Sequence, residues 1–252
     1  NPLGMVGMLL VMILAPLVRK VDVTGGTAAG RAIGALAGAN LARFTAELGG
    51  KAPLVVFEQA DVDAAVNGIA FGSFMASGQT CIASTRILVS NRVLPRLLDK
   101  LKAKTESITR RMGAPANPES AMGPLVSARQ LNHVETLVDE AVVSCHATAL
   151  VGGARLQGRS PLDGTDFSRG HFFAPTVLVS SGGGGGDGGD AADGILRTRI
   201  WREEAFGPVV VVVGFDTEAQ AVALANDSEF GLGASLWTQD LAQAFRVAEQ
   251  IE

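Results

Sequence analysis

The sequence predicts an α/β fold in which a largely parallel sheet is covered by helices. Short apolar runs, such as residues 54–57, 86–89 and 209–213, alternate with longer stretches of helical periodicity along nearly the whole chain. The 252 residues are 47% hydrophobic and 18% charged, which is ordinary for a protein that buries a sizeable core. This length fits one large domain, or one domain with part of another.

Charge and cysteine content narrow the class of partner. The net charge is −4 and no Lys/Arg cluster is present, so nucleic acid is not an expected partner. Cys81 and Cys145 cannot build a disulfide framework, which favours a reducing compartment and predicts a cytoplasmic protein. We expect no metal site.

The apolar opening, residues 5–15, is shorter than the roughly 20 apolar residues that cross a bilayer. It also lacks a preceding basic region and a following A-x-A cleavage site, so a secretory signal is not indicated. We expect a buried helix over residues 5–18 rather than a membrane segment.

A strand, a Gly-rich turn and a helix are predicted over residues 18–23, 24–30 and 31–42. This order of elements aims backbone N–H groups and a helix dipole at an anion. The glycines do not follow the G-x-G-x-x-G spacing, however, and tight packing between helix and strand explains them equally well.

The next elements place a cysteine in a turn. After the strand 54–57, Asp61 can cap a helix whose apolar face carries Val62, Val66, Ile69, Ala70 and Phe74. The helix ends near Ser77 and Gly78, and Cys81 follows in the turn before the strand 86–89. Small neighbours leave room for a substrate and for N–H groups that stabilise an oxyanion. Considered alone, such a cysteine is more often a buried inert thiol, and an isolated Glu47 is more often a solvated helix end.

Further elements follow in alternation. Helices are predicted at 94–112, 127–143, 218–225 and 241–252, and strands at 149–151, within 171–179, at 209–213 and at 230–237. The second of these helices should bury Leu131, Val134, Leu137, Val138 and Ala141. Cys145 at its end is expected to be structural, and the Gly-rich stretch 182–190 is expected to be a flexible loop.

Three segments resemble the signatures of the aldehyde dehydrogenase superfamily in order and spacing. They are Glu-Leu-Gly-Gly-Lys-Ala-Pro at 47–53, Gly-Gln-Thr-Cys at 78–81 and Glu-Glu-Ala-Phe-Gly-Pro-Val at 203–209. The resemblance runs from about residue 18 to the end of the chain. It implies that residues 1–48 form the end of a Rossmann-like dinucleotide-binding domain and residues 49–252 a largely complete parallel-sheet catalytic domain. It further implies NAD or NADP as cofactor and a small-molecule aldehyde as substrate.

The resemblance also implies a role for each matching residue. Cys81 would attack the aldehyde carbon, and Glu47 would activate the water that hydrolyses the resulting thioester. Glu204 and Phe206 would position the nicotinamide ribose. The remaining cofactor contacts would be Gly25 and Gly26 near the phosphates, and Leu48 and Gly49 near the nicotinamide.

The chain also departs from the family pattern. At Gly26 and Ala28 the family commonly has Ser and a longer, often acidic side chain. The asparagine that completes the oxyanion hole and the lysine that binds the adenosine ribose have no counterpart here. Members are homo-oligomers, which is doubtful for this chain. Three hypotheses remain: part of an NAD(P)+-dependent aldehyde dehydrogenase, an inactive relative with a binding role, and a protein with residual thiol-dependent esterase activity.

Overall fold

A computed structural model describes residues 19–144, 146–180 and 191–252 of the chain. The helix expected over residues 5–18, Cys145 and the Gly-rich stretch 182–190 lie outside the described residues. The chain divides into two compact units, Asn1–Gly49 and Gly50–Glu252. Each unit is described by itself.

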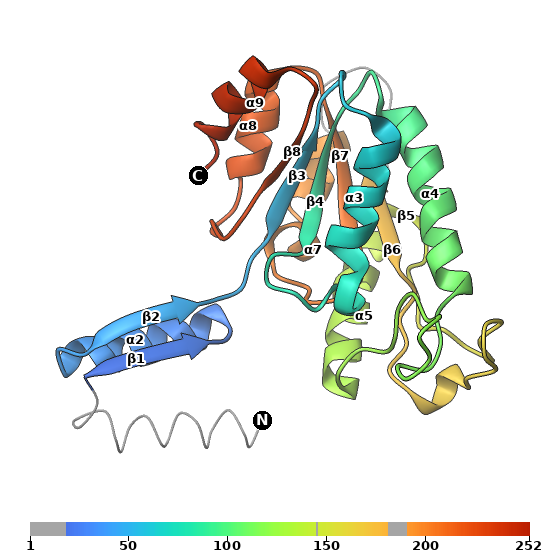
Figure 1. Ribbon diagram of the computed structural model, residues 1–252, viewed down its shortest axis with the longest axis horizontal. Coiled ribbons are helices and arrows are strands. Elements are labelled where there is room, and N and C mark those ends of the chain that lie inside the picture. The colour runs from blue at the N-terminus through green and yellow to red at the C-terminus, as the bar shows by residue number, and fades with distance from the viewer. Residues whose placement is uncertain (1–18, 145, 181–190) are drawn as a thin grey trace. The chain divides into compact units, whose positions relative to one another are not determined.

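The first unit contains two parallel strands and one helix. β1 (Lys20–Thr24) pairs with β2 (Arg43–Glu47), and α2 (Thr27–Ala39) connects them (Figure 1). The register places Thr24 opposite Glu47, so both strands end at the same edge. One expectation was wrong in this unit, because the helix begins at Thr27 instead of residue 31. The strand that ends at Glu47 was not predicted.

The second unit is built on a six-stranded sheet with the order β5-β6-β7-β4-β3-β8. Its strands are β3 (Ala52–Val56), β4 (Ser84–Ser90), β5 (Ala147–Val151), β6 (Thr176–Ser180), β7 (Val209–Phe215) and β8 (Ser235–Trp237). Only the pairing of β5 with β6 is antiparallel. The predicted α/β class with a largely parallel sheet is therefore confirmed. The strand expected over residues 230–237 is shorter, covering only the last three of them.

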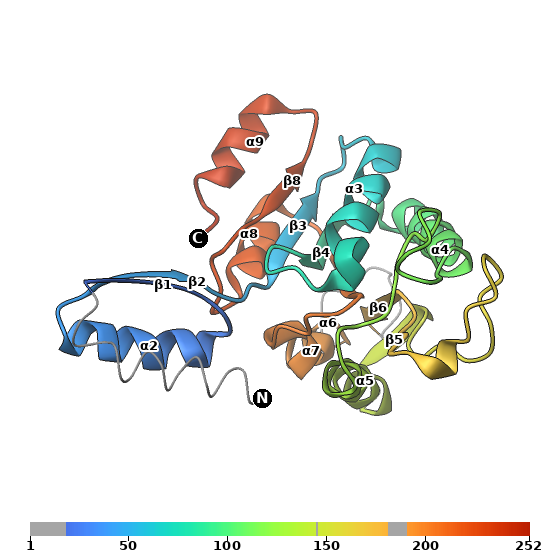
Figure 2. The ribbon, with the colours of Figure 1, turned by 60° about the horizontal axis from the view of Figure 1, so that its bottom comes forward.

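Helices cover both faces of this sheet, as Figure 2 shows. α3 (Val62–Phe74) and α4 (Leu94–Arg110) lie on one face. The other face carries α5 (Ala128–Val143), α6 (Ala191–Leu196), α7 (Arg199–Arg202) and α8 (Glu218–Asn226), while α9 (Leu241–Ala248) follows the edge strand β8. Short 3-10 helices occur at Met75–Gly78 and Phe167–Arg169. Within the described ranges, every helix is too short or too polar to cross a membrane.

Alternation along the central strands divides the core into two layers. In β3, Leu54 and Val56 pack with α3 and α4, whereas Val55 faces the layer that contains α5, α7 and α8. Successive side chains of a strand point to opposite faces, so a strand that is covered on both sides buries both sets of its side chains. The expected inward faces of the helices beginning at Val62 and Ala128 are buried as predicted.

Candidate active site

Three segments that are distant in sequence meet at the amino-terminal ends of neighbouring strands. Gly50 and Lys51 lead into β3, Cys81 precedes β4, and residues 203–208 lead into β7. The sheet order β7-β4-β3 makes these strands neighbours, and their parallel pairing brings the three entry segments to one edge. The sheet topology therefore assembles this site.

The loop that carries the thiol begins with three consecutive left-handed residues. After α3, the φ angles of Ala76, Ser77 and Gly78 are +50°, +59° and +69°. Two side-chain bonds hold this loop: Ser77 Oγ donates to the Gly123 carbonyl at 3.0 Å, and Gln79 Oε1 accepts from the Val126 N–H at 2.9 Å. Non-glycine residues adopt positive φ at an energetic cost that the surrounding contacts must offset. These contacts hold the loop in one defined conformation.

Cys81 follows this loop and is partly exposed to solvent. Among the described residues, no group accepts a hydrogen bond from its backbone N–H. Its carbonyl oxygen lies against Gly50, where an added Cβ would stand 2.3 Å from that oxygen. A glycine is required at position 50 because any side chain there would collide with the backbone of the cysteine.

The segment 203–208 packs against the same loop. A Cβ added to Gly78 would stand 2.3 Å from the Gly207 carbonyl oxygen, so two backbones touch at this point. Gln130 on α5 supports the segment by donating to the carbonyls of Ala205 at 2.8 Å and Phe206 at 2.9 Å. Phe206 itself has a φ of +48° and remains 36% exposed, so its ring is available to a ligand.

Glu204 joins this segment to the entry of β3. Its carboxylate accepts a hydrogen bond from the Gly50 N–H at 3.1 Å. Burial raises the pKa of Glu204 above its ordinary value, while the Gly50 N–H and the nearby Lys51 act in the opposite direction. The carboxylate is half-buried and next to backbone that also touches Cys81.

Two buried cations lie directly behind these backbone contacts. Lys51 is 2% exposed, and its Nζ has no hydrogen-bond partner within the described part of the chain. Burial, with a smaller contribution from Arg86, lowers the Lys51 pKa to about 7. Burial also lowers the Arg86 pKa, to about 10.

Arg86 on β4 connects this edge to α8. Its Nε donates to the Lys51 carbonyl at 2.8 Å, and its terminal nitrogens donate to the carbonyls of Leu224, Ala225 and Asp227. Its guanidinium also lies 5.2 Å from the centre of the Trp201 ring. Arg86 thereby donates to carbonyls at and just after the carboxyl end of α8.

In the first unit, the expected cofactor contacts lie at one end of the β1–β2 pair. Glu47 is exposed at the end of β2, and its carbonyl accepts from the Gly25 N–H at 3.0 Å. Gly26 precedes α2. Among residues 19–144, 146–180 and 191–252, no side chain caps that helix and no atom lies within 4 Å of an added Cβ at Gly26. Leu48 packs onto α2 at Gly30, where an added Cβ would stand 2.5 Å from the Leu48 side chain. An uncapped helix start with open space before it fits a phosphate.

The predicted site residues thus fall into two groups. Cys81, Glu204 and Phe206 belong to one cluster in the second unit, whereas Gly25, Gly26, Glu47, Leu48 and Gly49 belong to the first. Sequence reasoning gave no role to Lys51, Arg86 or Gln130. Lys51 was visible as the lysine that directly precedes a fully apolar strand, and that position signals burial.

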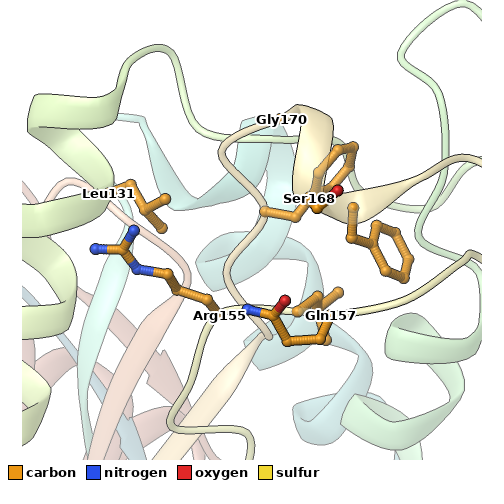
Figure 3. A pocket seen from close by; sticks show the side chains of 8 residues that line it. Leu131, Arg155, Gln157, Ser168 and Gly170 are labelled. Carbon is orange, nitrogen blue, oxygen red and sulfur yellow. The ribbon is translucent and has the colours of Figure 1, made fainter.

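A separate cavity of about 190 Å³ lies in the second unit between α5 and the loop before β6 (Figure 3). Its lining includes none of the predicted site residues. Arg155 at its rim is held by Glu135 at 2.7 Å and by Asn132 at 2.8 Å. The Arg155 guanidinium is therefore already hydrogen-bonded to neighbouring side chains.

The chain matches the family model described as "Aldehyde dehydrogenase family" over residues 6–252. It is 39% identical to a vanillin dehydrogenase of Pseudomonas fluorescens over 241 residues, covering 96% of this chain and 44% of that protein. A betaine aldehyde dehydrogenase of Sinorhizobium fredii is 37% identical over 237 residues, with 94% and 44% covered.

Solved structures agree with these relatives. HpcC of Thermus thermophilus superposes with a TM-score of 0.83 at 35% identity, covering 94% of this chain and 42% of that one. A point mutant of Staphylococcus aureus betaine aldehyde dehydrogenase, in complex with NAD+, gives 0.82 at 35% identity, with 96% and 45% covered. The chain spans less than half the length of these proteins.

Proposed function

This chain belongs to the aldehyde dehydrogenase family, and from that premise we propose that it serves the NAD(P)+-dependent oxidation of an aldehyde to a carboxylic acid. The observation that carries the proposal is the convergence of Gly50, Cys81 and the segment 203–208 at one edge of the sheet. These segments contact one another through backbone, so the thiol is presented by a rigid frame. Positioning of this kind is a large part of what a protein contributes to catalysis.

In the first step, the Cys81 thiolate attacks the aldehyde carbon. A C–S bond forms, and the carbonyl electron pair moves to oxygen, which gives a thiohemiacetal oxyanion. The Cys81 N–H has no acceptor among the described residues, so it is available to donate to that oxygen.

The cofactor contacts proposed for this chain are the residues that match the family pattern. Gly25 and Gly26 would meet the phosphates, Leu48 and Gly49 the nicotinamide, and Glu204 and Phe206 its ribose. When bound, NAD(P)+ supplies the hydride acceptor that aldehyde oxidation requires. Two observations support the fit: the α2 start has no side-chain cap, and the Glu204 carboxylate is half-buried beside Phe206.

In the last step, Glu47 acts as the general base. Once the thiohemiacetal has been oxidised, a thioester joins the acyl group to Cys81. Glu47 would take a proton from water, the oxygen would attack the acyl carbon, and the C–S bond would break to release the acid and the thiolate. Glu47 is exposed, as an accessible base requires.

The test is to mix the purified chain with NAD+ and a panel of aldehydes and to follow NADH absorbance. We expect NADH formation that Cys81→Ser abolishes and Cys145→Ser leaves unchanged. Glu47→Gln should retain a first burst of NADH and lose steady turnover, because acylation precedes the step that needs the base. Absence of NADH at high protein concentration rejects dehydrogenase activity for this chain.

A second candidate activity is ester hydrolysis, which needs the thiol and no cofactor. It is favoured by one observation: the contacts that hold the cysteine loop all lie within the unit Gly50–Glu252. Hydrolysis of p-nitrophenyl acetate without NAD+ measures it. Release of nitrophenol that persists in Cys81→Ser would exclude a thiol-dependent esterase.

A further inference from the structure

Gln130 on α5 is a side chain that the proposed chemistry does not use. Its Nε2 donates two hydrogen bonds, to the carbonyl oxygen of Ala205 at 2.8 Å and to that of Phe206 at 2.9 Å. These two residues lie 75 and 76 positions after the glutamine in the sequence. A single amide group therefore ties α5 to two consecutive peptide groups of the segment 203–208.

The local sequence favours a different use of this amide. Ser127 and Gln130 have the S-x-x-Q spacing of a capping box, in which the glutamine side chain reaches back to the backbone N–H of the serine. Only half of the box forms, because Ser127 Oγ accepts from the Gln130 N–H at 3.2 Å. Within the described ranges, no group accepts from the Ser127 N–H. The Gln130 amide serves the segment before β7 in place of its own helix.

The two peptide groups that Gln130 holds stand on either side of a strained residue. Phe206 has a φ of +48°, a left-handed conformation that a bulky side chain adopts only where its surroundings require it. The Ala205 carbonyl belongs to the peptide group before Phe206, and the Phe206 carbonyl belongs to the one after it. Because each peptide group is planar, holding both of them fixes the φ and ψ of the residue between them.

Neighbouring residues of α5 support the same segment beyond this turn. His133 Nε2 lies 3.5 Å from the Glu204 carbonyl oxygen, and an added Cβ at Gly207 would stand 2.4 Å from the Val134 side chain. Among the described residues, however, only Gln130 forms hydrogen bonds to the peptide groups on both sides of the strained residue. The left-handed turn therefore depends on this one side chain more than on any other polar contact.

We propose that Gln130 is a positioning residue for the cofactor side of the site. By holding the left-handed turn at Phe206, it presents the Phe206 ring, which is 36% exposed, and the preceding Glu204 carboxylate to a nicotinamide ribose. The identity of this ligand rests on the function proposed above. Without the two hydrogen bonds, Phe206 relaxes to the commoner conformations with negative φ. A ligand then binds only the molecules that keep the turn, so its apparent dissociation constant rises as their fraction falls.

The first test needs neither cofactor nor substrate. Gln130→Met keeps the length of the side chain and removes the donor, whereas Gln130→Lys restores a donor. Gln157→Met is the matched control, because it makes the same exchange at an exposed glutamine outside the site. NMR of the labelled chain gives the φ of Phe206 from its ¹³C shifts and its coupling between the amide and α protons.

We expect a left-handed Phe206 in the wild type, in Gln130→Lys and in Gln157→Met, and its loss in Gln130→Met. Gln130→Glu has the shape of glutamine without a donor, so it is a second variant that should behave as Gln130→Met does. A left-handed Phe206 that persists in both donor-free variants overturns the proposal. So does a turn that Gln130→Lys fails to restore, because a glutamine needed only for packing is not rescued by a donor.

The second test measures NAD+ binding by calorimetry, without turnover. If the turn remains in about a tenth of the molecules, Gln130→Met should raise the apparent dissociation constant about tenfold. Gln130→Lys should recover most of the affinity, and Gln157→Met should leave it unchanged. Unchanged affinity in a Gln130→Met chain that has lost the turn overturns the positioning role. A wild-type chain that binds no NAD+ contradicts the proposed function and the choice of ligand, while the NMR comparison decides the role of Gln130 in the turn by itself.

Discussion

Replacing Gly78 with alanine tests whether the thiol loop and the segment 203–208 are packed backbone to backbone. Gly78 has a φ of +69°, and its added Cβ would stand 2.3 Å from the Gly207 oxygen, 2.4 Å from the Gly207 carbonyl carbon and 2.7 Å from the Pro208 nitrogen. All three atoms belong to the backbone, so no side-chain rotation can relieve the collision. The two segments must separate by about 1 Å to restore ordinary contact distances.

The expected change in the free energy of unfolding has two costs and one smaller gain. Alanine in the left-handed region costs about 1 kcal/mol relative to glycine. Forcing an extra carbon into packed structure costs about 1–3 kcal/mol more. Alanine also lowers the conformational entropy of the unfolded chain, which stabilises the folded state by about 0.5 kcal/mol. We therefore expect Gly78→Ala to lower the free energy of unfolding by about 1.5–3.5 kcal/mol. With a urea dependence of about 2 kcal/mol per M, the midpoint should fall by about 1–2 M.

The assay is urea unfolding followed by tryptophan fluorescence. Trp201 and Trp237 are the two tryptophans of the chain, and both lie in the unit Gly50–Glu252, so the signal reports the unit that contains the loop.

Two control variants separate the two parts of this cost. Gly158→Ala tests backbone strain alone, because Gly158 has a φ of +74° and nothing within 4 Å of an added Cβ. Gly233→Ala has neither strain nor collision and should change little. If Gly78→Ala is no less stable than Gly158→Ala, the contact with Gly207 does not exist and the reasoning about the rigid frame is wrong.

Three further predictions concern Cys81, Arg86 and Lys51. Alkylation with iodoacetamide followed by mass spectrometry should modify Cys81 faster than Cys145, and equal rates would contradict an activated nucleophile. Arg86→Met should lower the free energy of unfolding by about 3 kcal/mol, because four buried or part-buried hydrogen bonds to backbone carbonyls are lost, whereas the exposed control Arg92→Met should cost under about 1 kcal/mol. Lys51 has a folded pKa of about 7 against an ordinary value of 10.5, so the unfolded chain binds its proton more tightly between these values and stability should rise with pH there. This group alone should add about 2 kcal/mol between pH 7 and pH 9, and a Lys51→Met variant that shows the same rise in urea titrations would refute the assignment.

The local sequence pattern predicted helices and strands correctly where its signal is strong. The helix that begins at Val62 has a capping Asp61, whose carboxylate accepts from the backbone N–H groups of Asp63 and Ala64, as its position predicted. The apolar runs at β3 and β7 are buried strands because they are short and continuous. The strand Arg43–Glu47 was missed because it is largely exposed and carries few apolar side chains. The early start of α2 was missed because its small residues give little periodicity.

The three signature segments, and Cys81, Glu204 and Phe206 within them, could be recognised from residue types and spacing alone. Their spatial relation could not, because the order β7-β4-β3 depends on which strands pair, and strand pairing is a long-range choice that leaves no trace in a local pattern. The same order decided that Gly50 touches Cys81, that Gly78 touches Gly207, and that Lys51 is buried with no hydrogen-bond partner among the described residues. The sequence by itself thus determined the kind of chemistry to expect, and the packing of parallel strands decided which backbone and charges surround the thiol.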